Sequence, residues 1–264
     1  MDDAPSDNAL TPTDRDFVSA LASGLDVIMA FDEAHPRMTL SEVATRTDMN
    51  RAKARRFLLT LHALGYVRKH QRYFELTPKV LQLGYSYLSS HNHRSVIQHY
   101  LEDITRDIGE SSSLGVLDGD EVIYIARSSA PHRLMAITLS TGTRLPAAYT
   151  SMGRILLAQL SDSELDDYLE DVKLTPYTDK TLTRRGDLKA AILTARQQGY
   201  AVVDQELDSG LRSIAIPAFD TEGKLLGALN ISTNAARVDM DTLLDSYLPL
   251  LKEKARQIQL SVSS

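Results

Sequence analysis

The stretch TLSEVATRTDMNRAKARRFLLTLHALGYVRKHQRYFEL, residues 39–76, decides the fold of the first part of the chain. Thr39 followed by Glu42 three residues later is a capping box, which predicts a short helix at this point. Residues 47–50 are typical of a turn, and the apolar spacing beyond them predicts a longer helix over residues 50–63. Two helices separated by a tight turn are therefore expected.

The longer helix is expected to have an apolar side and a basic side. On a helical wheel its apolar side chains fall together and should pack on other helices: Ala54, Phe57, Leu58, Leu61 and Leu64. Upstream, apolar spacing predicts another helix over residues 17–31, which residues 35–36 end. Gly65 stops the longer helix, and residues 66–69 and 73–76 predict two strands joined by a basic turn. Three helices followed by such a hairpin make a winged helix-turn-helix.

The basic side of this module is a candidate for contacting DNA. The major groove admits one α-helix, and side chains near its leading turns reach the base edges. Arg55 suits a guanine because its planar fork can donate to N7 and O6 together, whereas the hairpin cations suit phosphates or the minor groove. Arg56, nearer the helix middle, is either a phosphate contact or a structural ion-pair partner. The predicted DNA-binding residues are Arg51, Ala52, Lys53, Arg55, Arg56, Arg68, Lys69 and Arg72.

The charge distribution fits this prediction better than the net charge does. The 264 residues carry a net charge of -6, which alone argues against a polycation that coats nucleic acid or an anionic membrane. Residues 46–79, however, carry +7, between flanks of -7 over residues 1–45 and -6 over residues 80–264. A charge run is often only a solvated helix face. Its setting among helix, turn and hairpin signals favours a DNA-facing segment.

Composition excludes several other classes of protein. The chain contains no cysteine, so a disulfide framework, a thiolate nucleophile and a zinc site built on sulfur are all excluded. No apolar run approaches the roughly 18 residues that span a bilayer. The chain begins with an acidic, polar segment where a signal peptide is basic and then apolar. A cytoplasmic protein with no membrane partner is expected.

The rest of the chain mixes strand hairpins with helices, which predicts an α+β domain with an antiparallel sheet. Asp118-Gly119 between apolar strands is a strong hairpin signal. The expected boundaries are 1–76 for the winged module, 77–94 for a linker helix and 95–264 for the second domain. Its expected helices span residues 95–108, 151–160, 161–169, 188–198 and 240–260, the last interrupted by Pro249. Its expected strands span residues 114–117, 121–125, 134–139, 200–203, 211–219 and 225–232, with a loop over 141–146.

Four ordered motifs resemble the isocitrate lyase regulator (IclR) family of bacterial transcription factors. They are RAKARRFLLTLHALGYV (51–67), AYTSMGRILLA (148–158), GYAVVDQELDSGLRSIAIP (199–217) and GALNIS (227–232). Residues 51–60 and 145–158 look most like the branch that regulates protocatechuate, p-hydroxybenzoate and β-ketoadipate catabolism. The resemblance implies a winged helix-turn-helix tied to a GAF-like effector domain. It also implies a homo-oligomer, a dimer or a dimer of dimers. Because a dimer presents two winged modules, its expected target is pseudo-palindromic double-stranded operator DNA.

The resemblance also implies an effector site over the sheet. Carried over position by position, its contacts are Ser151 and Met152 at a helix start, and Asp204, Ser213, Asn230 and Ser232 on later strands. A helix N-terminus and hydroxyls suit a carboxylate, and apolar walls would hold the body of a small aromatic or dicarboxylic acid. The predicted walls are Leu134, Tyr149, Ile155 and Leu211, with Arg144 as counter-ion if it points inward. Strand serines are also often just exposed residues on the far face.

A small-molecule-processing enzyme with an incidental helix-turn-helix is the alternative. The sequence contains no G-x-S-x-G elbow, no glycine-rich phosphate loop and no H-E-x-x-H motif. His91 and His93 have the spacing of a metal pair on a strand, but they fall in a polar helix junction, where solvated histidines are expected. We therefore expect no catalytic residue, metal or cofactor. RNA polymerase is a further partner if the protein activates transcription.

Overall fold

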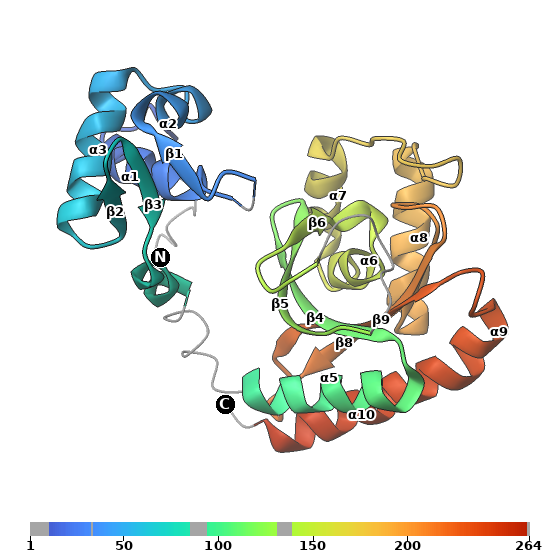
Figure 1. The fold of residues 1–264 in the computed structure, drawn as a ribbon. Helices are drawn as coiled ribbons and strands as arrows, with labels where there is room; N and C mark the ends of the chain where they lie inside the picture. The colour runs from blue at the N-terminus through green and yellow to red at the C-terminus, as the bar shows by residue number, and fades with distance from the viewer. Residues whose placement is uncertain (1–10, 33, 85–93, 131–138, 263–264) are drawn as a thin grey trace, which may run out of the picture. The chain divides into compact units, whose positions relative to one another are not determined.

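The computed structural model describes residues 11–32, 34–84, 94–130 and 139–262. They belong to two compact units, residues 1–91 and 92–264 (Figure 1). The predicted strand over 134–139 falls almost wholly outside the described residues, as do Leu134, His91 and His93. Within the described residues, no helix has the length and apolar character needed to cross a membrane.

The first unit is a winged helix-turn-helix. Its elements are α1 (Ser19–Met29), β1 (Arg37–Thr39), α2 (Leu40–Arg46), α3 (Arg51–Ala63), β2 (Val67–His70) and β3 (Tyr73–Leu76). The capping box predicted at the start of α2 is present, with the Thr39 backbone N–H donating to Glu42 Oε2 at 2.6 Å. Val27, Val43 and Leu58 from the three helices are fully buried in one core. The predicted helices and hairpin are confirmed.

One strand of this unit was not predicted, and one local prediction was wrong. A third strand, β1, pairs antiparallel with β3, so the wing is a sheet of order β1-β3-β2 rather than a hairpin alone. Leu64, expected on the packed face of α3, is 53% exposed, because it lies at the C-cap beyond the last helical turn. After β3, a 3-10 turn (Pro78–Val80) leads into helical residues 81–84.

The second unit is built on one antiparallel sheet of order β6-β5-β4-β9-β8-β7. Its strands are β4 (Ser111–Asp118), β5 (Glu121–Ser128), β6 (Arg144–Pro146), β7 (Ala201–Asp204), β8 (Leu211–Phe219) and β9 (Leu225–Asn234). Its helices include α5 (Arg94–Ile108), α6 (Ser151–Leu157), α7 (Asp162–Asp171), α8 (Arg185–Gln198) and α10 (Leu248–Ser261). The α+β class and the antiparallel sheet are confirmed. Part of the expected loop over 141–146 instead forms β6, which pairs with β5.

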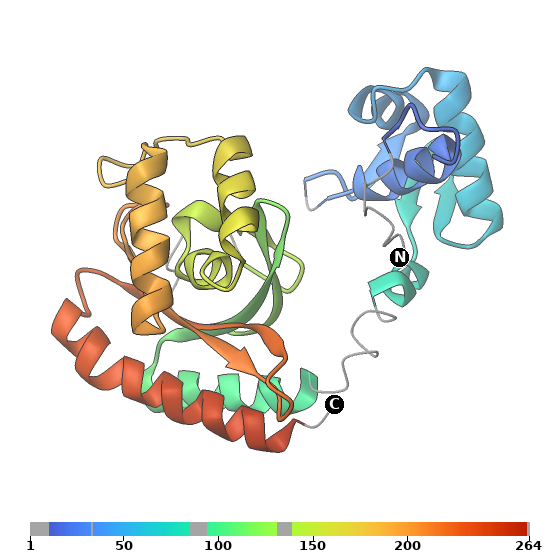
Figure 2. The same cartoon turned by 180° about the vertical axis from the view of Figure 1, so that it is seen from behind.

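The sheet separates two apolar layers. The helices α5 and α10 lie side by side across one face, and α6 lies in the curve of the other with α7 and α8 beyond it (Figures 1 and 2). Leu114, Ile214, Leu229 and Ile231 face α5 and α10, whereas neighbours of opposite parity on the same strands face α6.

The break predicted at Pro249 is also present. Residues Met240–Thr242 (α9) run into a π-helical turn, Leu243–Tyr247, before α10 begins with Pro249 in its first turn. A proline has no N–H to donate to the preceding turn, so a change of helix type at this point is expected.

Candidate functional sites

The first candidate site is the solvent-facing side of α3. The side chain of Asn50 caps the helix by accepting from the Lys53 N–H at 2.8 Å. Ala54 and Leu58 are fully buried, which turns the opposite side outward. All five predicted α3 contacts are exposed: Arg51, Ala52, Lys53, Arg55 and Arg56. Among the described residues, no carboxylate pairs with any of the four cations, so no ion pair of Arg56 is seen there.

Two other cations of the basic segment hold the fold together. Arg46 donates from Nε to the Ala30 carbonyl oxygen at 3.0 Å and from Nη2 to Asp32 Oδ2 at 2.6 Å. Lys79 donates from Nζ to the Leu64 carbonyl oxygen at 2.8 Å, at the C-terminal end of α3. These contacts tie α1 to α2 and the end of β3 to α3. The charge of +7 over residues 46–79 therefore includes cations that are engaged within the fold and are not free to contact a polyanion.

The wing sheet presents further cations on aromatic rings. Two guanidinium groups lie over the Tyr73 ring, Arg37 at 5.5 Å and Arg72 at 5.2 Å from the ring centroid. Arg72 Nη2 also donates to the Tyr73 hydroxyl at 3.1 Å. Lys69 Nζ lies 5.8 Å from the centre of the Phe74 ring. Such stacking orients a side chain and leaves its charge available.

Arg68 differs from its neighbours on the wing, because Nε donates to Glu75 Oε1 on the adjacent strand at 2.5 Å. Six predicted DNA-binding cations form no ion pair within 4.0 Å among the described residues, although Glu42 attracts Arg72 at longer range: Arg51, Lys53, Arg55, Arg56, Lys69 and Arg72.

The second candidate site lies on the α6 side of the large sheet, where polar residues align across the strands. In one row Arg127 is opposite Ser113, which is opposite Asn230. In the next row Ser111 is opposite Ser232, which is opposite Ser213. We call these six residues the polar rows.

The polar rows face α6 rather than α5. Ser112, between two of their members, donates its hydroxyl to the Leu101 carbonyl oxygen of α5, so its neighbours point the other way. Ala215 and Ala228, which share parity with the row residues of β8 and β9, belong to the α6 layer. The serines and Asn230 are 6% exposed or less. The alternative of solvent-exposed strand serines is therefore wrong.

Two buried polar atoms at this site have no hydrogen-bond partner among the described residues: Ser151 Oγ, at the start of α6, and Asn230 Oδ1. Asn230 uses its Nδ2 to donate to Ser232 Oγ at 2.9 Å, so its carbonyl oxygen is the free acceptor. An unpaired buried polar group costs about 1–3 kcal/mol. These atoms are suited to a polar ligand.

The start of α6 is held close to the strands. A Cβ on Gly115 would lie 3.0 Å from Met152 Sδ, and one on Gly153 would lie 2.1 Å from the Ala147 carbonyl oxygen, so only glycine fits at both positions. Thr150 Oγ1 already accepts from the Gly153 N–H, and α6 has seven residues. A charged ligand group therefore needs a cation as well as this helix end.

The residues predicted to form apolar walls differ in their burial. Tyr149 and Ile155 are buried in the α6 layer, where the Tyr149 hydroxyl accepts from the Thr175 N–H at 2.6 Å. Burial raises the pKa of Tyr149, which keeps its hydroxyl protonated. Leu211 is half-buried at the start of β8, and its alternation with Ser213 puts it on the α6 side.

Arg144 and Asp204 do not occupy the predicted roles. Arg144 pairs with Asp118 at 2.7 Å and with Glu121 at 2.5 Å on the solvent side of the sheet edge, so it is not an inward counter-ion. Asp204 pairs with Arg212 Nε at 2.8 Å and with Lys180 Nζ at 2.9 Å. Burial raises the pKa of Asp204, but these hydrogen bonds outweigh it and lower that pKa to about 2. Both carboxylate oxygens of Asp204 are already engaged.

Arg127 is the site residue that sequence reasoning missed. Regular alternation along β5 places Arg127 on the face opposite Tyr124, but a bulge shifts the pairing with β4 between Leu114 and Gly115. The shift turns Arg127 to the same side as Tyr124, whose ring centroid lies 5.8 Å from the guanidinium carbon. A bulge leaves little signal in a single sequence, so alternation alone could not have found this cation.

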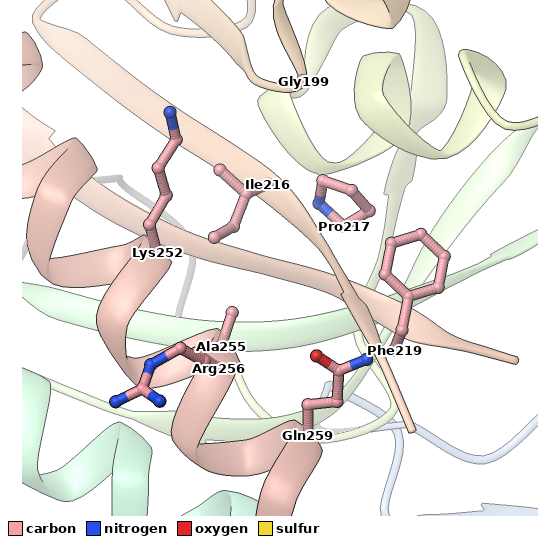
Figure 3. A pocket seen from close by; sticks show the side chains of 8 residues that line it. All are labelled: Gly199, Ile216, Pro217, Phe219, Lys252, Ala255, Arg256 and Gln259. Carbon is pink, nitrogen blue, oxygen red and sulfur yellow. The ribbon is translucent and has the colours of Figure 1, made fainter. Parts of the chain in front are cut away.

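Another pocket on the second unit lacks, among the described residues that line it, the unpaired buried polar atoms found at the second candidate site. It has a volume of about 260 Å³ and lies between α10 and β8, on the far face of the sheet from the polar rows (Figure 3). Its polar side chains are engaged or exposed: Gln259 donates to the Asp220 carbonyl oxygen at 3.1 Å, and Arg256 pairs with Glu253. Over the described ranges, no group of three or more His, Asp or Glu side chains is arranged to hold a metal ion.

A winged helix-turn-helix with a cationic helix face, followed by a domain with a buried polar site, defines a ligand-responsive DNA-binding regulator. Comparison with known proteins agrees. Residues 20–71 match the IclR helix-turn-helix domain, and residues 85–260 match the C-terminal domain of the bacterial transcriptional regulator IclR. The chain belongs to the IclR family.

Individual relatives show which branch of the family the chain resembles. The chain is 45% identical to the Pca regulon regulatory protein of Pseudomonas putida over 93% of its own length and 84% of the relative's. A crystal structure of a transcriptional regulator from Rhodococcus sp. RHA1 is 49% identical and covers 93% of this chain and 98% of that one, with a TM-score of 0.81. A double mutant of the inducer-binding domain of the Acinetobacter transcription factor PobR, in complex with 3-hydroxybenzoic acid, is 30% identical. It covers 63% of this chain and 97% of that one, with a TM-score of 0.58. These likenesses place the chain near the Pca and Pob regulators, as its motifs indicated.

Proposed function

We propose that the protein controls genes of aromatic-acid catabolism by binding a pseudo-palindromic operator and releasing or reshaping it when a small carboxylic acid binds the second unit. The observation that carries the DNA-binding part is the set of unpaired cations on α3 and the wing. They can neutralise phosphates on either side of the groove that α3 enters. The effector part is supported by the buried polar rows and by the aromatic acid bound to the PobR domain.

The working form is a homo-oligomer, a dimer or a dimer of dimers. One exposed face of α1 supports this, because Val18, Leu21, Leu25 and Met29 recur there at helical spacing and are 44–69% exposed. Contiguous exposed apolar patches typically mark surfaces that contact another protein. Two winged modules in a dimer would match the two halves of a pseudo-palindrome. RNA polymerase is a partner if the protein activates transcription. The protein acts in the cytoplasm.

Two measurements test the proposal. The first selects double-stranded DNA from a random pool with the full-length protein and measures its affinity by fluorescence anisotropy at several salt concentrations. Specific binding that weakens steeply with salt is expected, because bound cations displace condensed counterions. A flat salt response would count against the α3 and wing surface.

The second measurement adds p-hydroxybenzoate, protocatechuate or a β-ketoadipate-type dicarboxylate to the selected complex. One of these acids should change the DNA affinity and be recovered chemically unchanged. Turnover of the acid with no effect on DNA binding would favour the alternative, an enzyme that carries an incidental helix-turn-helix.

A further inference from the structure

Arg127 differs from the other buried or half-buried cations described in the second unit, because no carboxylate among the described residues pairs with it. Each of the other buried or half-buried arginines and lysines whose side chains are described contacts a carboxylate: Arg154, Lys189, Arg196, Arg212 and Lys254. Arg127 is half-buried, and its two hydrogen bonds go to neutral hydroxyls, from Nη1 to Ser113 Oγ at 3.0 Å and from Nε to Ser129 Oγ at 3.2 Å.

These contacts hold the guanidinium without neutralising it. An arginine has five N–H donors, and the two hydroxyls accept from two of them. The positive charge is held on the α6 side by the row partner Ser113 and by the ring of Tyr124. A half-buried cation with no counter-charge is costly, and burial here lowers the pKa of Arg127. An anion at this position would remove that cost.

The polar rows supply the rest of a binding surface. Asn230, two strands from Arg127 in the same row, has its Oδ1 free, and Ser151 Oγ is free at the start of α6. The surface therefore offers a cation at one end and an unpaired acceptor and hydroxyl further along. A small acid with a polar group remote from its carboxylate matches this arrangement of a cation and two neutral polar groups.

We propose that Arg127 is the specificity-determining cation of the effector site, receiving the carboxylate of a small acid while Asn230 Oδ1 and Ser151 Oγ bind its remote polar group. The inference rests on the proposed function, because it assumes that an acid binds the second unit. It replaces Arg144, whose guanidinium is held by two surface carboxylates.

The test compares each acid with its own carboxamide. The probes are 3-hydroxybenzoate, 4-hydroxybenzoate and adipate with the corresponding amides, titrated into the full-length protein by isothermal calorimetry. Wild type should bind at least one acid about 10- to 100-fold more tightly than its amide, because a charge-assisted contact is stronger than a neutral one. In Arg127→Gln this ratio should fall close to one, mainly through loss of acid binding. A purely structural role would weaken both forms equally and leave the ratio unchanged.

Two further variants keep the test decisive. Arg144→Gln removes an exposed arginine from the neighbouring strand and should keep the wild-type ratio. If Arg127→Gln does not fold, Asn230→Asp provides the second measurement, since a carboxylate beside the bound acid should lower the acid-to-amide ratio by repulsion. An unchanged ratio in Arg127→Gln, or in Asn230→Asp where the first does not fold, would overturn the inference and leave the proposed function standing. Wild type that binds none of the acids would overturn both.

Discussion

Replacing Glu206 by glutamine should destabilise the second unit by breaking the most buried ion pair among its described residues. The side chains of Arg154 and Glu206 are 5% and 10% exposed. Arg154 Nη1 donates to Glu206 Oε1 at 2.7 Å, and Nη2 donates to Oε2 at 2.5 Å. Glutamine keeps the shape of the side chain but removes its charge, and its NH₂ group would face a guanidinium N–H. The positive charge of Arg154 would then stay buried without a counter-charge.

The expected cost follows from that burial. Removing one partner of a buried pair costs about 3–5 kcal/mol. For a domain of this size each kcal/mol lowers the midpoint temperature by roughly 2–4 °C, so Glu206→Gln should lower Tm by roughly 6–20 °C. The matched control is Asp166→Asn, which breaks a pair with Lys189 in which both side chains are about half exposed. Exposed pairs contribute about 0–1 kcal/mol, so the control should shift Tm by no more than about 4 °C.

Differential scanning calorimetry of the full-length protein at neutral pH would measure both variants. A Glu206→Gln transition within the range of Asp166→Asn would refute the assumption that this pair is desolvated. The double variant Arg154→Met with Glu206→Gln removes the uncompensated charge and should recover most of the lost stability. If the double variant melts as low as the single one, the unpaired charge is not the cause.

Three further predictions concern single residues. Arg55→Ala should weaken binding to selected operator DNA by about 1–3 kcal/mol and relax one base preference, measured by anisotropy; an equal loss on random DNA would show a phosphate contact instead. Because Arg212 and Lys180 lower the folded-state pKa of Asp204 to about 2, below its unfolded value near 4, its carboxylate contributes stability above pH 4. That contribution, about 2 kcal/mol, is lost as pH falls from 4 towards 2, so Tm should fall less steeply over that range in Asp204→Asn than in wild type; parallel curves would contradict this. Asn50→Ala removes the N-cap of α3 and should cost the first unit about 0.5–2 kcal/mol by calorimetry, whereas an unchanged transition would mean that the cap is dispensable.

The helices could be predicted because their ends carry local chemistry. Thr39 with Glu42 forms the predicted capping box, and Ser161 with Glu164 forms a second one at the start of α7; in both, side chain and backbone hydrogen-bond reciprocally. These signals depend on residues three apart and need no tertiary context. The hairpin of β4 and β5 was predictable for the same reason, since Gly119 adopts the positive φ of 61° that its tight turn requires.

The errors lie where pairing between distant segments decides the outcome. β1 has three residues and exists because Met38 pairs with Phe74, which no local pattern indicates. The role given to Arg144 depended on the direction of its side chain, and two acids on neighbouring segments set that direction. Arg127 was missed because one bulge reverses the alternation of β5. Strand faces are set by register, and a shift of one residue exchanges them.

The buried pair bears on regulation as well as on stability. Arg154 lies one turn beyond Ser151 on α6, and it also donates to the Ala148 carbonyl oxygen at 3.2 Å, ahead of the helix. Glu206 belongs to a loop whose backbone accepts a hydrogen bond from Thr181 at 2.6 Å. These contacts hold the start of α6 in place, so an acid at the proposed site would not need to spend binding energy on ordering it. An effector shifts an equilibrium only by its difference in affinity between two conformations. In a site ordered in advance, more of the binding energy is available for that difference.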